Sequence, residues 1–192
     1  MKLSALVCTT AFLGFLAGPA LAAVTVMGDD SATRCSEAAY HDDAGNDSIA
    51  LCTKAIEDGG LNRRDLAGTY INRGVMHMDR GDYAGARSDF DESIQIDPSI
   101  GEAWVNRGAV NIIDKRYKDG IADIDKGLGL GTQEPAKAYY NRGVAYEQMD
   151  DEKSAYLDYE QALTLEPKWD LPKQELLRFT VTRRDPGAAP PQ

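Results

Sequence analysis

The sequence predicts an all-α fold, a solenoid of stacked helical hairpins, and three observations predict it. A short phrase, aromatic, any residue, Asn-Arg-Gly, occurs three times, at Tyr70–Gly74, Trp104–Gly108 and Tyr139–Gly143. The phrase has a period, because its glycines are 34 and then 35 residues apart. Similar stretches follow each copy, at Gly81–Pro98, Lys115–Thr132 and Asp150–Pro167. Each unit has the pattern of two amphipathic helices, which bury their apolar sides only by stacking on neighbouring units.

The chain begins with the order of residues found in secretory signal peptides. Met1 and Lys2 precede a long apolar run, and the small residues Ala20 and Ala22 follow it. We expect cleavage after Ala22. The alternative is an uncleaved membrane anchor, for which the apolar run is short. Residues 23–32 are expected to form a flexible lead-in.

The repeated units resemble the tetratricopeptide repeat (TPR) family. In that family a bulky aromatic is followed by Leu-Gly, then by Ala-x-x-x-Phe, a small residue and Pro. The chain has matching small and core residues at Ala86, Gly120 and Ala155, at Phe90, Ile124 and Tyr159, and at Ser93, Gly127 and Ala162. It departs from the pattern where Arg replaces Leu, at Arg73, Arg107 and Arg142. The resemblance implies a right-handed α-solenoid with units at 67–100, 101–135 and 136–168.

A degenerate first hairpin is expected at residues 33–66. Its Cys35 and Cys52 lie 17 residues apart, the same spacing as between each repeated Arg and the core residue of its second helix. Because exported proteins keep disulfides, we expect a Cys35–Cys52 bond, and the alternative is two buried thiols. At the other end, residues 169–181 are expected to form a capping helix and residues 182–192 a disordered tail.

An Asp precedes the core residue of the second helix in each clear unit, whereas the first hairpin lacks both this Asp and the Arg. The joint loss predicts three structural ion pairs, Arg73–Asp89, Arg107–Asp123 and Arg142–Asp158. The alternative is a row of arginines that binds anions, because Arg can bind a carboxylate through two hydrogen bonds at once.

The resemblance implies that the residue before each Arg lines the concave surface of the solenoid. Asn72, Asn106 and Asn141 would form a ladder there, and an amide can bond a peptide backbone without reading its sequence. Helical spacing adds apolar neighbours to this expected groove: Ile71, Val75, Met78, Val105, Ala109, Ile112, Tyr140 and Val144. The family's basic clamp for acidic peptide ends is matched only at Lys137. The alternatives are amides that bond to the next helix, and a groove covered by the terminal helix or by a second copy.

The excess of acidic side chains argues against two classes of partner, nucleic acids and anionic membranes. Residues 1–22 carry one Lys and no acidic residue, so the mature chain keeps 20 basic and 31 acidic side chains. Phosphate backbones and anionic lipids repel such a chain. We therefore expect no nucleic acid as partner and, after cleavage, no membrane.

The sequence contains little that could carry catalysis. It has two histidines, His41 and His77, and it shows no phosphate-binding loop, nucleophile elbow or HExxH motif. A metal site at His41, Asp42 and Asp43 would rest on a single loop. We expect no catalytic residues, no metal and no cofactor.

These observations predict an exported protein–protein interaction module, periplasmic or secreted, and most simply in the periplasm of a Gram-negative bacterium. Its concave groove would hold an extended or helical segment of a partner protein. One alternative is a self-assembling structural unit whose groove is filled by its own helix or by a second copy. A more remote alternative is an enzyme.

Overall fold

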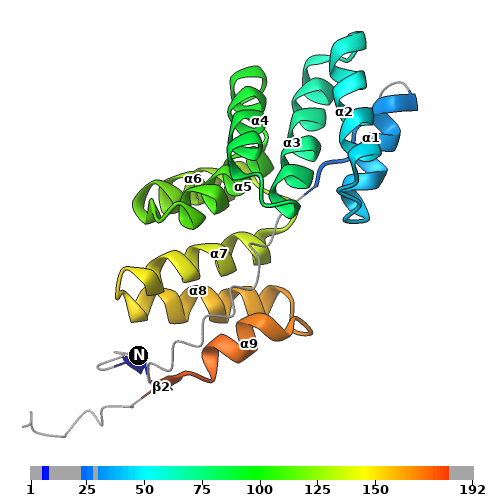
Figure 1. The fold of residues 1–192 in the computed structure, drawn as a ribbon. Coiled ribbons are helices and arrows are strands. Elements are labelled where there is room, and N and C mark those ends of the chain that lie inside the picture. The colour runs from blue at the N-terminus through cyan, green and yellow to red at the C-terminus, as the bar shows by residue number, and fades with distance from the viewer. Residues whose placement is uncertain (1–5, 9–22, 28–29, 182–192) are drawn as a thin grey trace, which may run out of the picture.

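The computed structural model of the chain describes residues 6–8, 23–27 and 30–181 (Figure 1). That part of the chain forms nine helices and two short strands. The helices are α1 (Asp30–Tyr40), α2 (Asn46–Asp58), α3 (Arg63–Asp79), α4 (Tyr83–Ile96), α5 (Gly101–Ile113), α6 (Tyr117–Leu130), α7 (Pro135–Gln148), α8 (Glu152–Leu165) and α9 (Asp170–Leu176). The strands are β1 (Leu6–Cys8) and β2 (Phe179–Val181). The predicted all-α solenoid is confirmed.

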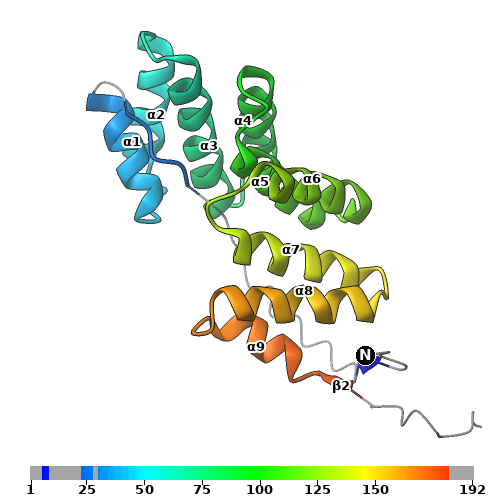
Figure 2. The ribbon, with the colours of Figure 1, turned by 180° about the vertical axis from the view of Figure 1, so that it is seen from behind.

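The first eight helices form four hairpins that follow one another along the chain. Helix α1 packs on α2, α3 on α4, α5 on α6 and α7 on α8, and each hairpin also contacts the next one. The first helices of successive hairpins contact each other, α1 with α3, α3 with α5 and α5 with α7. They form the inner layer of a solenoid in which each hairpin is turned relative to the one before (Figure 1; Figure 2).

A tight turn joins the two helices of each clear repeat. Gly81 has a φ of 74° between α3 and α4, and Lys115 and Asp150 have φ values of 61° and 60° at the corresponding turns. Left-handed backbone favours glycine, so the second and third turns carry strain that the first avoids. The Asp82 side chain then starts α4 by accepting a hydrogen bond from the N–H of Gly85 at 3.0 Å.

The Gly of the repeated phrase sets the distance between the two helices of a hairpin. A Cβ at Gly74 would lie 2.6 Å from the ring of Phe90. Gly108 and Gly120 face each other, since a Cβ on either would lie 2.9 Å from the carbonyl oxygen of the other. A larger residue at these positions would force the paired helices apart.

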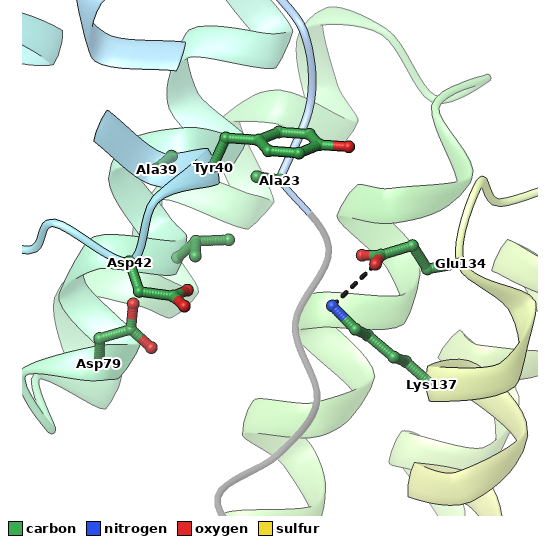
Figure 3. A pocket seen from close by; sticks show the side chains of 8 residues that line it. Ala23, Ala39, Tyr40, Asp42, Asp79, Glu134 and Lys137 are labelled. Carbon is green, nitrogen blue, oxygen red and sulfur yellow. Dashed lines mark ion pairs between the residues drawn. The ribbon is translucent and has the colours of Figure 1, made fainter. Parts of the chain in front are cut away.

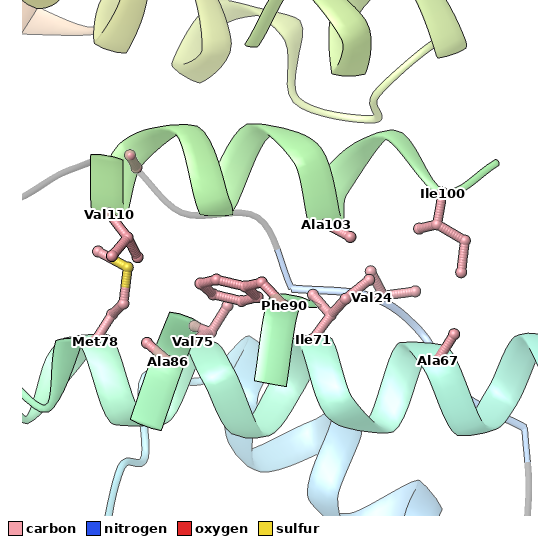
Figure 4. Packing of buried hydrophobic residues seen from close by; sticks show 11 residues of the cluster. Val24, Ala67, Ile71, Val75, Met78, Ala86, Phe90, Ile100, Ala103 and Val110 are labelled. Atoms are coloured by element: carbon pink, nitrogen blue, oxygen red, sulfur yellow. The ribbon is translucent and has the colours of Figure 1, made fainter. Parts of the chain in front are cut away.

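One apolar cluster joins the second hairpin to the third (Figure 4). Helix α3 lies on one side and α5 on the other, with the ring of Phe90 from α4 between them. Its buried side chains are Val24, Ala67, Ile71, Val75, Met78, Ala86, Phe90, Ile100, Ala103, Ala109 and Val110. The cluster therefore includes a residue, Val24, that precedes the first helix.

The structure corrects the expectation of a flexible lead-in at residues 23–32. Residues 23–27 are extended and packed, since Val24 and Val26 are only 4% and 3% exposed, and α1 begins at Asp30. The physical reason is that Val24 packs against apolar residues of α3, and Val26 packs against apolar residues of α1 and α2.

The capping helix is also shorter than the predicted range of 169–181. Helix α9 ends at Leu176, and β2 then pairs antiparallel with β1, with Val7 opposite Thr180. Aromatic and β-branched residues such as those of β2 favour extended backbone over helix, which accounts for the early end of α9.

Residues near this cap cover the last repeat as expected. The rings of Trp169 and Tyr140 lie with centroids 5.0 Å apart, and those of Phe179 and Tyr156 lie 5.9 Å apart. These contacts bury the outer side of the α7–α8 hairpin, on which no further repeat stacks among the described residues.

The predicted cleavage site after Ala22 and the predicted tail at 182–192 lie outside the described residues. Strand β1 belongs to the segment whose removal we predict, so a mature chain would lack its pairing with β2. Among the helices that the structure describes, none has the length and apolar character needed to cross a membrane.

Candidate functional site

The Arg of the repeated phrase makes the predicted ion pair in each repeat. Arg107 donates to Asp123 through Nε at 2.8 Å and through Nη2 at 2.7 Å. This hydrogen bonding raises the pKa of the Arg107 guanidinium, although burial opposes the shift. The same two bonds join the other predicted pairs, Arg73–Asp89 and Arg142–Asp158.

All three arginines also tie their hairpin to the previous one, and Arg73 does so by donating to the Thr53 hydroxyl of α2 at 3.1 Å. Arg107 donates to Asp91 of α4 at 2.8 Å, and Arg142 donates to Asp125 of α6 at 2.5 Å. The aromatic of the phrase covers the guanidinium, with the Trp104 ring centroid 4.8 Å from the Arg107 carbon. Because carboxylates and a ring already surround these groups, the geometry favours the structural interpretation over an anion-binding row.

Cys35 and Cys52 form the predicted disulfide bond, with their Cα atoms 4.9 Å apart. The bond joins α1 to α2, and both cysteines are buried in a cluster with Met76 of α3. It holds together the degenerate hairpin, which lacks the Arg–Asp pair of the other three.

Residues 23–27 lie as an extended segment against α1 and α3. The N–H of Val24 donates to Oδ1 of Asn72 at 2.8 Å, and Nδ2 of Asn72 donates to the carbonyl oxygen of Val24 at 2.7 Å. On the other side, the Ser36 hydroxyl donates to the same carbonyl at 3.0 Å and accepts from the N–H of Val26 at 3.2 Å. Two buried polar side chains, one from each helix, thus bind three backbone groups of the segment.

The side chains of this segment alternate between the protein and solvent. Val24 and Val26 are buried, whereas Thr25 and Met27 are exposed. Gly68 of α3 allows the close approach, because a Cβ there would lie 2.9 Å from Cγ2 of Val26. Burying two valines stabilises the bound segment by roughly 1.5–3 kcal/mol each.

Most of the predicted groove residues are buried, as in the alternative in which the groove is covered. Of the eleven, Ile112 and Val144 are half-buried and the other nine are buried. Val105 and Ile112 point at Gly127 and Gly120, on the second helix of their own hairpin. The small residues on α6 leave room for these side chains, so they pack inside the hairpin.

Other predicted groove residues also have structural contacts. Tyr140 lies against Trp169, as described above. Asn106 and Asn141 are buried like Asn72, at 0% and 3% exposure. Helix α3 turns its predicted residues toward α5 and Val24: Ile71, Val75 and Met78 (Figure 4). Contact of any of these residues with a partner protein stays a prediction.

The segment, Ser36 and Gly68 were not predicted from the sequence, whereas Asn72 was. Two β-branched valines on either side of Thr25 form the period-two pattern of an extended strand, and this signal could have indicated Val24 and Val26. Ser36 gave no signal, because it stands in the degenerate hairpin at the position that Gly holds in the clear repeats.

A cavity at the start of the segment carries acidic side chains. Its lining is Ala23, Ala39, Tyr40, Asp42, Val75, Asp79, Glu134 and Lys137 (Figure 3). Lys137 binds Glu134 at 2.8 Å, whereas Asp42 and Asp79 form no ion pair within the described residues. Partial burial, and then the charge of Asp42, raise the pKa of Asp79.

The two histidines have different surroundings. His77 Nδ1 lies 2.9 Å from Asp82, and His41 lies exposed in the turn after α1. In the parts of the chain that the structure describes, no three potential metal ligands come together.

Parts of the chain match a known protein family and known relatives. Two family models, both described as tetratricopeptide repeat, match residues 67–100 and 136–168. The SGT1 homolog of rice is 30% identical over 97 residues, which cover 50% of this chain and 25% of the relative. The Hsp70-Hsp90 organizing protein of wheat is 29% identical over 120 residues, which cover 62% of this chain and 20% of the relative. The chain thus spans a quarter or less of the length of these relatives.

Solved structures share the fold. MamA has a TM-score of 0.61 at 20% identity, over 80% of this chain and 84% of that one. The TPR domain of Arabidopsis OM64 has a TM-score of 0.57 at 22% identity, over 61% and 96%. The first TPR of Spaghetti (RPAP3), bound to the HSP90 peptide SRMEEVD, has a TM-score of 0.56 at 24% identity, over 60% and 93%. The two model matches identify residues 67–100 and 136–168 as tetratricopeptide repeats, and the similar solved structures show that the described chain has the same solenoid fold.

Proposed function

We propose that this chain is an exported protein–protein interaction module that holds an extended segment of a partner along its inner helices. The observation that carries the proposal is the pair of hydrogen bonds between the Asn72 amide and the backbone of Val24. An amide that both donates and accepts holds an extended chain whatever its side chains are. The same residue type stands at the same place in the next two repeats, as Asn106 and Asn141.

The relatives support this kind of partner. The RPAP3 repeat is described as bound to an HSP90 peptide, and the wheat relative is named an Hsp70-Hsp90 organizing protein. The family therefore supports a protein segment as ligand rather than a small molecule, and an interaction module rather than an enzyme. The segment that α1 and α3 hold suggests a ligand with β-branched residues at alternate positions, because those residues fill the spaces beside Gly68.

Affinity capture tests the interaction. Mature wild type and an Asn72/Asn106/Asn141→Ala variant of equal helicity are immobilised and exposed to periplasmic extract. The proposal predicts a protein that wild type retains and the variant loses. Asn46→Ala is the matched control, because it removes an exposed amide on α2 whose Oδ1 accepts a hydrogen bond from the exposed Arg80. Equal retention by all three proteins would contradict binding through the amides.

Export is tested by mass. We propose that the full chain, produced in a Gram-negative host, appears in the periplasm without residues 1–22. A protein of full mass in the membrane fraction would instead favour the uncleaved anchor.

A second candidate function is a self-contained structural unit, and one observation favours it. Val24 shows that the chain can fill part of its inner face with its own residues, although these come from the N-terminal side and not from the terminal helix. The molecular mass of the mature chain across a range of concentrations separates the possibilities. A mass that rises with concentration favours self-assembly, and a constant monomer mass favours an intramolecular segment.

A further inference from the structure

We propose that the start of the mature chain is an intramolecular ligand of the inner face, anchored by attraction between its own N-terminal ammonium group and the carboxylates of Asp42 and Asp79, which line the same cavity as Ala23. Removal of residues 1–22 would create this group on Ala23. The inference rests on the export part of the proposed function, because cleavage after Ala22 forms the ammonium. It does not depend on the identity of a partner protein.

The backbone of the segment fixes the position of the new terminus. Asn72 and Ser36 hold Val24 and Val26 through four hydrogen bonds, and Gly68 receives the valine side chains. The residue before Val24 has little freedom once these contacts form. Ala23 accordingly lies at the wall of the acidic cavity (Figure 3).

The charges around the cavity suit a cation better than the uncharged peptide bond that precedes Ala23 in the full chain. Asp42 follows α1 and Asp79 ends α3, and neither has a cationic partner among the described residues. Across the cavity, the charge of Glu134 is matched by Lys137 of α7, and Tyr40 adds a hydroxyl. Two carboxylates without a cationic partner among the described residues therefore line the same cavity as the residue on which cleavage would put one positive charge.

An ammonium at this position should have a raised pKa and should make binding of the segment depend on pH. Nearby carboxylates favour its charged form, so its pKa should rise above the ordinary value of about 7.7–8.0. A group whose folded pKa is raised stabilises the bound state fully below its ordinary pKa, and this stabilisation is lost as the pH rises through the folded pKa. The segment should then loosen at alkaline pH.

The experiment uses a chain that begins at Ala23, prepared by cleaving a fusion protein so that no export step is needed. The pKa of the Ala23 amino group is measured by NMR titration, together with hydrogen exchange of the Val24 amide. We expect a pKa about one unit above the ordinary value in wild type, and an ordinary value in Asp42→Asn/Asp79→Asn. Glu160→Gln/Glu166→Gln removes the same charge from α8 and its end, and it should behave as wild type does.

Equal pKa values in wild type and in Asp42→Asn/Asp79→Asn would overturn the proposal. A chain that keeps Ala22 as its first residue supplies a second test, because the added residue displaces the ammonium. It should show faster exchange at Val24, and unchanged exchange would again contradict the anchor. Failure of affinity capture would leave these results unaffected, since they concern the chain's own terminus.

Discussion

The Asn72 side chain accepts a hydrogen bond from the N–H of Val24 and donates one to the carbonyl oxygen of the same residue, at 2.8 and 2.7 Å. This amide stands in the middle of the inner layer, on the first helix of a repeat. It performs within the chain the backbone contact that we propose for a partner segment.

The Asn72 contact predicts the effect of removing the amide. Asn72→Ala leaves the buried N–H of Val24 without its partner, which costs about 1–3 kcal/mol of segment binding. Hydrogen exchange of the Val24 amide should become at least about tenfold faster, as measured by NMR. Asn46→Ala should leave this exchange rate unchanged, and an equal rate in Asn72→Ala would contradict the assigned contact.

A variant at Gly68 distinguishes the effect of a side chain on segment binding from its effect on the stability of α3. Alanine raises helix propensity by about 0.8–1.0 kcal/mol, but at Gly68 its Cβ would lie 2.9 Å from Val26. Gly68→Ala should therefore speed hydrogen exchange at Val24 and Val26. Gly129→Ala is the matched control, because a Cβ there meets nothing within 4 Å. It should raise the free energy of unfolding by about 1 kcal/mol and leave the exchange rates alone.

The carboxylates bound to Arg107 should differ in their contribution to stability. Asp123 is 11% exposed, whereas Asp91 is 52% exposed. Asp123→Asn should lower the free energy of unfolding by about 2–3 kcal/mol, because it leaves a partly buried guanidinium without its main partner. Asp91→Asn should cost less than about 1 kcal/mol. Denaturant unfolding measures both, and equal losses would argue against a structural role for the Asp123 pair.

The disulfide should support the degenerate hairpin. Replacing Cys35 and Cys52 with alanine should lower the free energy of unfolding by roughly 3 kcal/mol, as expected for a short closed loop. A reductant should lower the stability of wild type and leave that of the double variant unchanged. If the reductant left the free energy of unfolding of wild type unchanged, the bond would be absent from the mature protein.

Tyr140 predicts a loss of stability in alkali. Its burial, and then the charge of Glu175, raise the pKa of Tyr140 to about 12, against about 10 in an unfolded chain. The folded chain keeps this proton longer, so the stabilisation is complete below pH 10 and is lost as the pH rises toward 12. Over that range the free energy of unfolding of Tyr140→Phe should fall by about 2–3 kcal/mol less than that of wild type.

The decline is followed by urea unfolding at a series of pH values. Tyr83→Phe, which changes a tyrosine that is 38% exposed, is the control and should decline as wild type does. Identical curves for wild type and Tyr140→Phe would show that burial of this hydroxyl does not govern the alkaline limit.

The repeat made most of the fold predictable. Glycines such as Gly108 recur because paired helices approach closely, and the Arg73–Asp89 pair recurs because each hairpin needs the same link. The cysteines stood out because they replace residues of this pattern. The spacing of the repeats and the residues that depart from it can be read from the sequence alone, so these features could be predicted without the structure.

The candidate site was less predictable, because it depends on contacts between distant parts of the chain. Asn72 was identified as a backbone clamp, but nothing local showed that Val24, 48 residues earlier, is what it holds. The apolar residues near Asn72 were expected in a groove. Which side of the inner helix they occupy depends on the small residues of the facing helix, as Val105 and Gly127 show.

The central claim is that the inner helices hold an extended backbone through Asn72. It is tested most directly by adding a synthetic peptide with the sequence of residues 23–29 to a mature chain in which Val24→Asp and Val26→Asp release the native segment. We predict saturable NMR shifts of the Asn72 side-chain amide and of Ser36, and no saturable shift at Ser36 when Asn72→Ala is added. Equal shifts at Ser36 in both backgrounds, or none at any peptide concentration, would contradict the account.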